Sequence, residues 1–225
     1  MLTRLKRLLR PAKKPVARTF TRTPESILLE TDKWASSEVV LGLAKIVSVR
    51  PYPLDELLLM SAAFQYHRPE MVIDIGTHVG KSARIWYELS RKFNPQCAVH
   101  TIDLCDPQHA EFPGERLGSY IHGLPVTQHI GDGYAIAKDL VESNIGKRLL
   151  LFLDGDHGFD TVRRELELLK PNEETAALVH DTFYQPGSSY YHGPYLAIEE
   201  FRREFSCAQV FHLQLGLPGM SYLSR

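Results

Sequence analysis

The residues best suited to chemistry lie in two short segments, LDGDHGFD (153–160) and VHDT (179–182), each at the end of a strongly apolar run. Such runs are typical of buried strands, and if the two strands are neighbours, the carboxylates of Asp154 and Asp181 lie a few ångströms apart. Two carboxylates at that separation repel each other unless one binds a proton or a cation lies between them. A hard divalent cation such as Mg²⁺ or Mn²⁺ would resolve the repulsion, because it prefers oxygen ligands.

Two histidines next to these carboxylates could act as a metal ligand or as a base. His180 directly precedes Asp181, and as a ligand it would favour Mn²⁺, Fe²⁺ or Zn²⁺ over Mg²⁺. His157 follows Asp154 by three positions, and because imidazole changes its charge near neutral pH, it could accept a proton from a substrate. The alternative roles of His157 are to cap the following helix or to bond to Asp154, and Asp156 is an alternative ligand or base.

A third segment, VIDIGTHVGKSA (72–83), has the pattern of a strand that turns into a helix beside a ligand. Gly76 and Gly80 permit positive φ and let a ligand approach the backbone, and the following helix presents free N–H groups. Asp103 ends the next predicted strand, 23 residues after Gly80, where it can accept two hydrogen bonds from ribose hydroxyls. The G-x-x-x-G spacing differs from the G-x-G-x-x-G of dinucleotide enzymes, so the pattern favours a nucleoside ligand over NAD.

The elements that must position these residues alternate between short β-rich runs and amphipathic segments, which predicts a doubly wound α/β fold with a mostly parallel, seven-stranded sheet. Ligands bind beyond the carboxyl ends of the strands in such sheets, where all three segments fall. An N-terminal helical stretch over 34–67, with Ser36 or Ser37 as its cap and a break at PYP (51–53), precedes the sheet. The expected strands are 71–75, 97–103, 125–130, 148–154, 176–181 and a terminal antiparallel hairpin of 208–214 and 220–225, and the expected helices are 81–93, 134–143, 161–170 and 194–205.

Composition bounds the class of protein. The 225 residues are 44% apolar and 24% charged, as in a soluble globular protein, and no apolar run is long enough for a membrane-spanning helix. The three cysteines, Cys97, Cys105 and Cys207, contain no CxxC, which argues against a disulfide framework or a zinc cage and favours a reducing, cytoplasmic compartment.

The charge is unevenly distributed along the chain. Eight of the 26 basic residues lie within 1–22, which leaves 18 basic against 27 acidic residues in the rest. An acidic body argues against extended nucleic-acid binding. The basic arm could contact an anionic membrane surface or an acidic partner, and its alternatives are a solubilising tail or the start of a transit peptide. We expect an arm over 1–25, helices over 26–67 that pack on the core, and a cofactor-binding domain over 68–225.

With these motifs in this order, the chain resembles the class I S-adenosylmethionine-dependent methyltransferases over residues 55–225. Within that class it resembles the catechol-type O-methyltransferases and their relatives in sugar and natural-product tailoring. The motifs that carry the resemblance are VIDIGTHVGKSA (72–83), LFLDGDHGFDTV (151–162) and LVHDT (178–182).

The resemblance implies S-adenosylmethionine as the cofactor. Gly76 and Gly80 would face it, and Ser82 would contact its methionine carboxylate, unless Ser82 only caps its helix. Asp103 would hold the ribose, and Asp132 would lie near the adenine, unless it only forms a turn with the following glycine. The full set of implied cofactor contacts is Asp74, Gly76, Thr77, Gly80, Ser82, Asp103, Asp132 and Asp154.

The resemblance also implies a divalent metal ion and a base. The metal-dependent catechol-type enzymes bind their ion through two strand-end aspartates and an adjacent asparagine. Asp154 and Asp181 match these aspartates, but Thr182, a weaker ligand, stands at the asparagine position. The implied ligand set is therefore Asp154, Asp181, His180 and Thr182, with the presence of the ion and the choice between Mg²⁺ and Mn²⁺ left open. His157 stands where those enzymes carry a catalytic lysine, so His157 and Asp154 are the implied catalytic residues.

The expected function is metal-assisted transfer of a methyl group from S-adenosylmethionine to a hydroxyl of a small molecule, which could be a sugar, a phenol or a natural product. The alternatives are an NAD-type oxidoreductase on a similar sheet, a non-catalytic cofactor-binding homologue and a metal-dependent hydrolase. The identity of the acceptor and homo-oligomerisation stay open.

Overall fold

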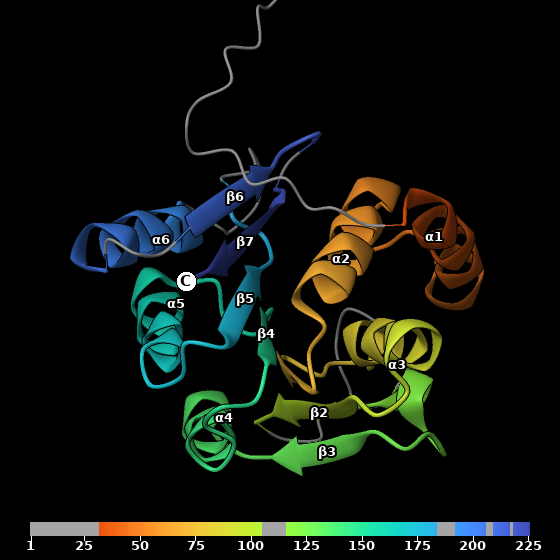
Figure 1. Cartoon of the computed structure of the whole chain (residues 1–225), viewed down its shortest axis with the longest axis horizontal. Helices are drawn as coiled ribbons and strands as arrows, with labels where there is room; N and C mark the ends of the chain where they lie inside the picture. The colour runs from red at the N-terminus through yellow and green to blue at the C-terminus, as the bar shows by residue number, and fades with distance from the viewer. Residues whose placement is uncertain (1–31, 105–115, 184–191, 206–208, 217) are drawn as a thin grey trace, which may run out of the picture.

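The computed structural model describes residues 32–104, 116–183, 192–205, 209–216 and 218–225, and their strands form one sheet in the order β3-β2-β1-β4-β5-β7-β6 (Figure 1). The first five strands of the chain run parallel, whereas β7 is antiparallel to β5 and β6 is antiparallel to β7. The strands are β1 (Met71–Ile75), β2 (Ala98–Asp103), β3 (Thr127–Ile130), β4 (Leu149–Leu153), β5 (Thr175–Val179), β6 (Gln209–Leu213) and β7 (Met220–Ser224).

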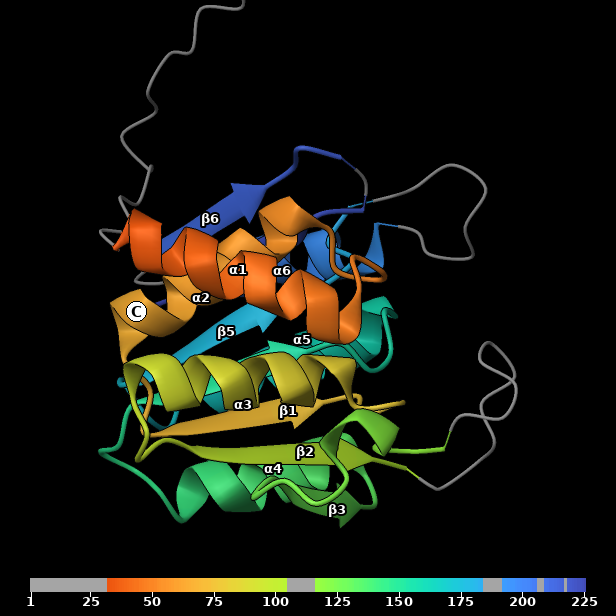
Figure 2. The same cartoon turned by 90° about the vertical axis from the view of Figure 1, so that its right-hand side faces the viewer.

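Helices cover both faces of this sheet, three on each (Figure 1). The helices α1, α2 and α3 contact one another on one face, where Figure 2 shows α1 and α3 in front of the strands with α2 behind α1, and α4, α5 and α6 cover the other. Their bounds are α1 (Lys33–Val47), α2 (Leu54–His67), α3 (Lys81–Phe93), α4 (Gly133–Glu142), α5 (Phe159–Leu166) and α6 (Gly193–Glu204). Two 3₁₀ turns, Ser119–Ile121 and Glu167–Leu169, complete the helical elements among the described residues.

The two hydrophobic cores follow from the alternation of side chains along each strand. In β4, Leu151 points into the core under α4–α6, and the next residue, Phe152, points into the core under α1–α3. All five residues of β1, β4 and β5 are buried, as expected of central parallel strands covered on both faces. Because both faces are closed by helices, a ligand can reach this sheet only at the strand ends.

The expected doubly wound sheet with a terminal antiparallel hairpin is confirmed. The predicted strand 71–75 and helix 81–93 have the observed bounds, and the other predicted elements differ by at most two residues at either end, except for the helix expected over 161–170. The helix expected over 161–170 begins earlier, at Phe159, and ends in the 3₁₀ turn Glu167–Leu169. The predictions about the basic arm, Cys105 and Cys207 concern residues outside the described ranges.

The predicted cap of the first helix was wrong. The cap is Asp32, whose side-chain carboxylate accepts hydrogen bonds from the backbone N–H groups of Trp34 and Ala35. Ser37 lies inside the helix, where its hydroxyl donates back to the carbonyl of Lys33. A carboxylate placed one residue before the helix reaches the free N–H groups that the serines, already inside the first turns, cannot reach.

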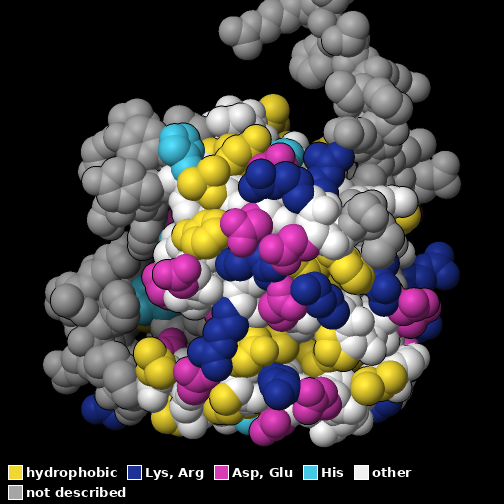
Figure 3. Space-filling model, turned by 90° about the vertical axis from the view of Figure 1, so that its left-hand side faces the viewer, with side chains coloured by type: hydrophobic (Ala, Val, Ile, Leu, Met, Phe, Trp, Pro, Cys, Tyr) yellow, Lys and Arg dark blue, Asp and Glu magenta, His cyan; other side chains and the backbone are white. Residues whose placement is uncertain are grey.

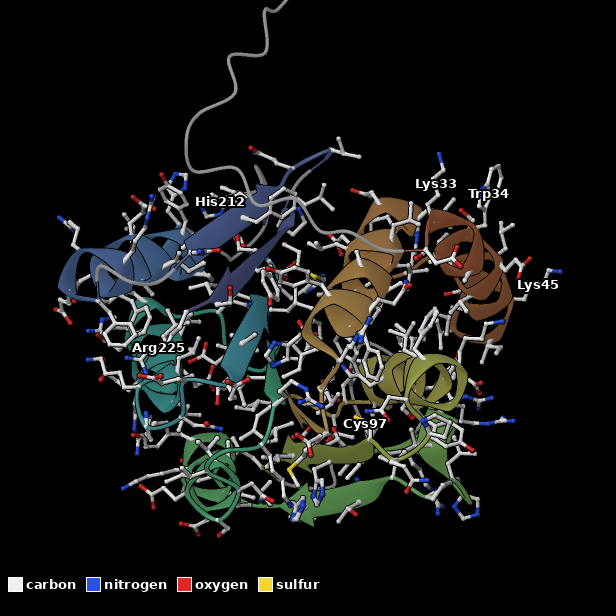
Figure 4. All side chains as sticks on the ribbon, in the orientation of Figure 1. Lys33, Trp34, Lys45, Cys97, His212 and Arg225 are labelled. Carbon is white, nitrogen blue, oxygen red and sulfur yellow. The ribbon has the colours of Figure 1, made fainter. Side chains whose placement is uncertain are left out.

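The N-terminal helices pack on the same core as the sheet. Leu57, Met60 and Phe64 of α2 are buried against side chains from β1 and β4. Trp34 at the start of α1 instead points away from the body of the molecule and is 75% exposed (Figure 4). No helix among the described residues is long and apolar enough to cross a membrane.

The surface over α4, α5 and α6 mixes positive and negative side chains rather than separating them (Figure 3). Arg163 of α5, for example, pairs with Glu167 and with Glu200 and Glu204 of α6. These pairs tie α5 to α6 on the side of the sheet opposite α1–α3. Exposed ion pairs of this kind contribute little individually, so the apolar contact between the two helices must hold them together.

If α2 is part of the folding core, truncating its buried face must destabilise the whole protein. Leu57→Ala is expected to lower the free energy of unfolding by about 2–5 kcal/mol, because Leu57 is completely buried. Leu58→Ala, one residue further along and 42% exposed, is the matched control, with an expected change within about 0.5 kcal/mol. Urea unfolding of both variants measures this, and equal stabilities would contradict the packing of α2 on the sheet.

Candidate active site

The loop after β1 lies tightly against the end of β4. Gly76 adopts φ +108° and Gly80, at the start of α3, adopts φ +88°, a region that L side chains rarely occupy. A Cβ atom on Gly76 would lie 2.3 Å from the backbone carbonyl oxygen of Asp154. The glycines therefore allow the loop to reach the strand end where the acidic segment begins.

A buried hydrogen-bond network lies beneath this loop. One oxygen of Asp74 accepts hydrogen bonds from Ser82 (2.9 Å) and Thr101 (2.8 Å), and the hydroxyls of Thr101 and Thr77 are 2.7 Å apart. Asp74 is completely buried, and this burial raises the pKa of its carboxyl group to about 8. The Ser82 hydroxyl, expected at the methionine carboxylate, donates to Asp74 instead, so its functional assignment stays a prediction.

The next two strand ends each carry an aspartate that organises its own loop. Asp103 accepts hydrogen bonds from the backbone N–H groups of His78 and Leu104, both at 2.8 Å. This links the end of β2 to the glycine loop after β1. Asp132 caps α4 by accepting from the N–H of Ala135, so the structural role considered for it is present.

These elements surround one cavity of about 830 Å³, a size that suits a small-molecule ligand. The cavity runs from the glycine loop past Asp103 and Asp132 to the acidic and histidine side chains at the ends of β4 and β5. The predicted site residues that line it are Gly76, Thr77, Ser82, Asp103, Asp132, Asp154, His157, His180 and Asp181. Asp74, Gly80 and Thr182 support the walls without lining them.

Asp154 is the centre of a buried chain of hydrogen bonds. Its Oδ2 accepts a hydrogen bond from the hydroxyl of Tyr52 at 2.5 Å, and its Oδ1 lies 2.8 Å from Nδ1 of His180. The other ring nitrogen of His180, Nε2, lies 2.9 Å from Oε2 of Glu56. The imidazole of His180 therefore bridges two carboxylates, one from the end of β4 and one from α2.

The electrostatics of this chain favour a protonated imidazole. Burial opposes the charge on His180, but the neighbouring Asp154 carboxylate and the hydrogen bonds outweigh it, so the pKa of His180 is raised well above its usual value. Burial alone would raise the pKa of Asp154, yet His180 and the hydroxyl of Tyr52 lower it overall. Desolvation, followed by the charge of Asp154, raises the pKa of Tyr52, which keeps its hydroxyl a donor.

His157 lies on the cavity side of the same carboxylates. Its Nε2 is 3.9 Å from Oδ1 of Asp154 and 3.7 Å from Oδ2 of Asp181. Burial raises the pKa of Asp181, partly offset by the charges of His180 and His157. Both histidines line the cavity, but the ring of His180 is held between Asp154 and Glu56 of α2. His157 lies beside the acids at the strand ends, so it is the better placed of the two to exchange a proton with a ligand.

The residues expected to bind a metal are arranged differently from a metal site. Nδ1 of His180 lies between the carboxylates of Asp154 and Asp181, at 2.8 and 3.3 Å, which is where an ion shared by the two aspartates would have to sit. Thr182 is completely buried, and its hydroxyl donates to the carbonyl of Val179. Within the described ranges, no group of three or more His, Cys, Asp or Glu side chains has a metal-binding arrangement. The four-residue ligand set does not fit an ion in this arrangement.

The residues of the site that escaped the sequence analysis include Tyr52, Glu56 and Thr101. Glu56 carried a signal, because it lies on the buried stripe of α2 four residues before Met60, where an acid needs a partner. Tyr52 stands between two prolines, and nothing in that pattern connects it with a strand end far along the chain.

The close approach of β1 and β4 gives a direct test. Gly76→Ala is expected to destabilise the protein by at least about 2 kcal/mol and to abolish cofactor binding, because the new methyl group meets the backbone of Asp154 at an unfavourable φ. Gly42→Ala is the control, since a Cβ there meets nothing within 4 Å and a helical alanine is expected to add about 0.5–1 kcal/mol. Thermal unfolding and calorimetric titration measure both effects, and normal binding by the Gly76 variant would contradict the described loop.

Comparison with solved structures shows the same fold in methyltransferases. A methyltransferase of Podospora anserina, PaMTH1, solved with S-adenosylhomocysteine, is 16% identical, with 88% of this chain and 98% of that chain covered and a TM-score of 0.53. CalS11, a TDP-rhamnose 3′-O-methyltransferase of calicheamicin biosynthesis, is 15% identical, with 87% and 96% covered and a TM-score of 0.50. MycE, solved with Mg, S-adenosylhomocysteine and mycinamycin VI, is 15% identical, with 82% and 54% covered and a TM-score of 0.55.

Sequence comparison identifies the family. None of the curated protein sequences compared with the chain matches it. The family model named Rhamnosyl O-methyltransferase/CmcI matches residues 46–213, about three quarters of the chain. This match includes the glycine loop, the strand-end aspartates and both histidines of the site, and it confirms the resemblance seen in the motifs. The chain therefore belongs to the rhamnosyl O-methyltransferase/CmcI family and is an S-adenosylmethionine-dependent methyltransferase with a Rossmann-like fold.

Proposed function

We propose that this enzyme methylates a hydroxyl group of a sugar, or of a natural product that carries one, and that His157 accepts the proton of that hydroxyl. The observation that carries the proposal is the position of His157 beside Asp154 and Asp181 on the wall of the cavity that the glycine loop also lines. The family description and the rhamnose-modifying CalS11 support a sugar as the acceptor. A phenol is the alternative acceptor.

The residues present fit S-adenosylmethionine. The glycine loop leaves space that a side chain at Gly76 would fill, and Asp103 has the remaining lone pairs to accept from ribose hydroxyls. When bound, the cofactor supplies a methyl group on a positively charged sulfur. The carboxylates of Glu56 and Asp154 share one imidazole between them, so this end of the cavity keeps negative charge that favours a nearby cation.

The part of His157 follows from its surroundings. Asp154 and Asp181 lie within 4 Å of its Nε2, so a proton taken up by the imidazole is stabilised by their charge. The ring is also largely shielded from solvent, since its side chain is 8% exposed. A hydroxyl group held in the cavity beside Nε2 would give its proton to the imidazole as its oxygen bonds to the methyl carbon and the carbon–sulfur bond breaks, and no covalent enzyme intermediate is required.

A histidine base should be separable from cofactor binding. His157→Gln is expected to lower the rate of methyl transfer by about 10²–10⁴-fold, because glutamine cannot accept the proton. The affinity for S-adenosylmethionine, measured by calorimetric titration, should stay at the wild-type value. His122→Gln, at an exposed position, is the matched control and should retain full activity. A His157 variant with a wild-type rate would rule out this base.

The divalent ion suggested by the motifs can be tested on the same protein. MycE was solved with Mg, but in this chain His180 lies between the aspartates that would share the ion. We therefore expect S-adenosylmethionine binding and methyl transfer to be the same in EDTA as in Mg²⁺ or Mn²⁺. Activity that is lost in EDTA and restored by Mg²⁺ would show that His180 leaves this position, and it would reinstate the predicted ligand set.

The acceptor class can be narrowed by a radiolabel transfer assay. Nucleoside diphosphate sugars, free deoxysugars and catechols are incubated with the enzyme and labelled S-adenosylmethionine, and methylated products are separated by chromatography. Transfer to a sugar would support the proposal. If the cofactor binds and only catechols are methylated, the acceptor is a phenol rather than a sugar. If the cofactor binds and neither class is methylated, the proposed acceptor class is wrong.

A further inference from the structure

One carboxyl oxygen of an acidic side chain on α5 has no hydrogen-bond partner in the part of the chain that the structure describes. Glu165 is only 3% exposed, and its Oε2 is buried without a hydrogen bond. Such a group costs free energy, since it has lost its water and gained nothing in return. Its side chain nevertheless lines the central cavity. A ligand in that cavity can supply the missing bond.

The neighbours of Glu165 define one end of the cavity. Thr161, one turn earlier on α5, donates to Asp156 Oδ2 at 2.6 Å, and the guanidinium of Arg164 lies 4.0 Å from the ring centroid of Tyr134 on α4. These residues and the cap residue Asp132 all line the cavity. The part of the cavity between α4 and α5 is therefore lined by polar side chains and by the aromatic ring of Tyr134.

Burial, together with the neighbouring acidic side chains, keeps the carboxyl group of Glu165 neutral. Burial raises its pKa to about 8, the charges of Asp156 and Asp132 add to this, and Arg164 partly opposes it. A neutral carboxyl group presents a donor and an acceptor side by side. Adenine has the complementary pair, because its exocyclic amino group donates next to a ring nitrogen that accepts.

We propose that Glu165 recognises the adenine ring of S-adenosylmethionine, with its carbonyl oxygen accepting from the amino group and its hydroxyl donating to the adjacent ring nitrogen. Asp132, which the family resemblance places near the adenine, uses one oxygen to cap α4, and its other oxygen can accept from the second amino hydrogen. Glu165 thereby selects the base, whereas Asp103 is left to hold the sugar. This proposal rests on S-adenosylmethionine as the cofactor.

The test compares two replacements of Glu165 by calorimetric titration with S-adenosylhomocysteine. Glu165→Gln keeps a donor beside an acceptor and should bind close to the wild-type affinity, whereas Glu165→Leu removes both and should bind about 10- to 100-fold more weakly. Both variants should unfold at or above the wild-type temperature, because each removes a buried acid. Asp139→Asn and Asp139→Leu, at an exposed position of α4, are the matched controls and should change nothing.

A second ligand and a second condition separate recognition from structure. An analogue of S-adenosylhomocysteine whose adenine amino group is replaced by hydrogen should bind the wild type more weakly than S-adenosylhomocysteine does. Glu165→Leu should bind the two ligands with nearly the same affinity, because the contact with the amino group is already absent. Wild-type affinity should also fall relative to that of Glu165→Gln as the pH rises through about 8, because the ionised carboxylate can no longer donate.

The proposal would be overturned if Glu165→Leu bound S-adenosylhomocysteine with wild-type affinity. It would also be overturned if the Gln and Leu variants lost the same affinity and still discriminated against the analogue as the wild type does. Failure of the wild-type chain to bind S-adenosylhomocysteine at all would overturn the cofactor assignment, and the adenine contact with it. The two failures are therefore distinguishable.

Discussion

The imidazole of His180, bonded on one side to Asp154 and on the other to Glu56, is the interaction on which the rest of the site depends. Asp154 ends β4 in the middle of the sheet, and Glu56 belongs to α2, which precedes the first strand. One buried side chain thus joins the N-terminal helices to the carboxyl edge of the sheet. Removing either carboxylate would leave the remaining charges without compensation in a largely buried region, which is costly.

This arrangement explains why the N-terminal helices belong with the catalytic domain although they contribute nothing to the sheet. Tyr52, in the segment between α1 and α2, donates to the same aspartate that His180 contacts. Its ring also packs edge-on against Phe152, which ties the polar site to the hydrophobic core beneath it. The core under α1–α3 and the position of the carboxylate at Asp154 are therefore coupled, so a change in how α2 packs must also move the site.

Much of this structure could be predicted from sequence because the signals are local. A strand such as Leu149–Leu153 is a continuous apolar run, and the ends of β4 and β2 are marked by Asp154 and Asp103. The topology of a doubly wound sheet then brings these ends together without any knowledge of side-chain contacts. The errors have a different origin. The cap of α1 is Asp32 and not a serine, because more than one residue near the start of a helix can serve as its cap. The bond between Glu56 and His180 joins residues 124 positions apart, and no periodicity in the sequence indicates such a contact.

Some buried acids at the site have a lowered pKa and others a raised pKa, and the difference depends on whether a positively charged side chain lies beside the carboxyl group. Asp154 has His180 beside it, and its pKa is lowered although it is completely buried. Asp74 and Glu165 have no such partner, and burial raises the pKa of each to about 8, so both are neutral at neutral pH. The cavity wall therefore carries charged carboxylates, Asp154 beside His180 and Asp132 and Asp156 near Glu165, together with the neutral carboxyl group of Glu165, which can both donate and accept hydrogen bonds. A cofactor with a positively charged sulfur and an uncharged purine uses both kinds of group, because the charged carboxylates attract a cation and a neutral carboxyl group can exchange hydrogen bonds with the purine.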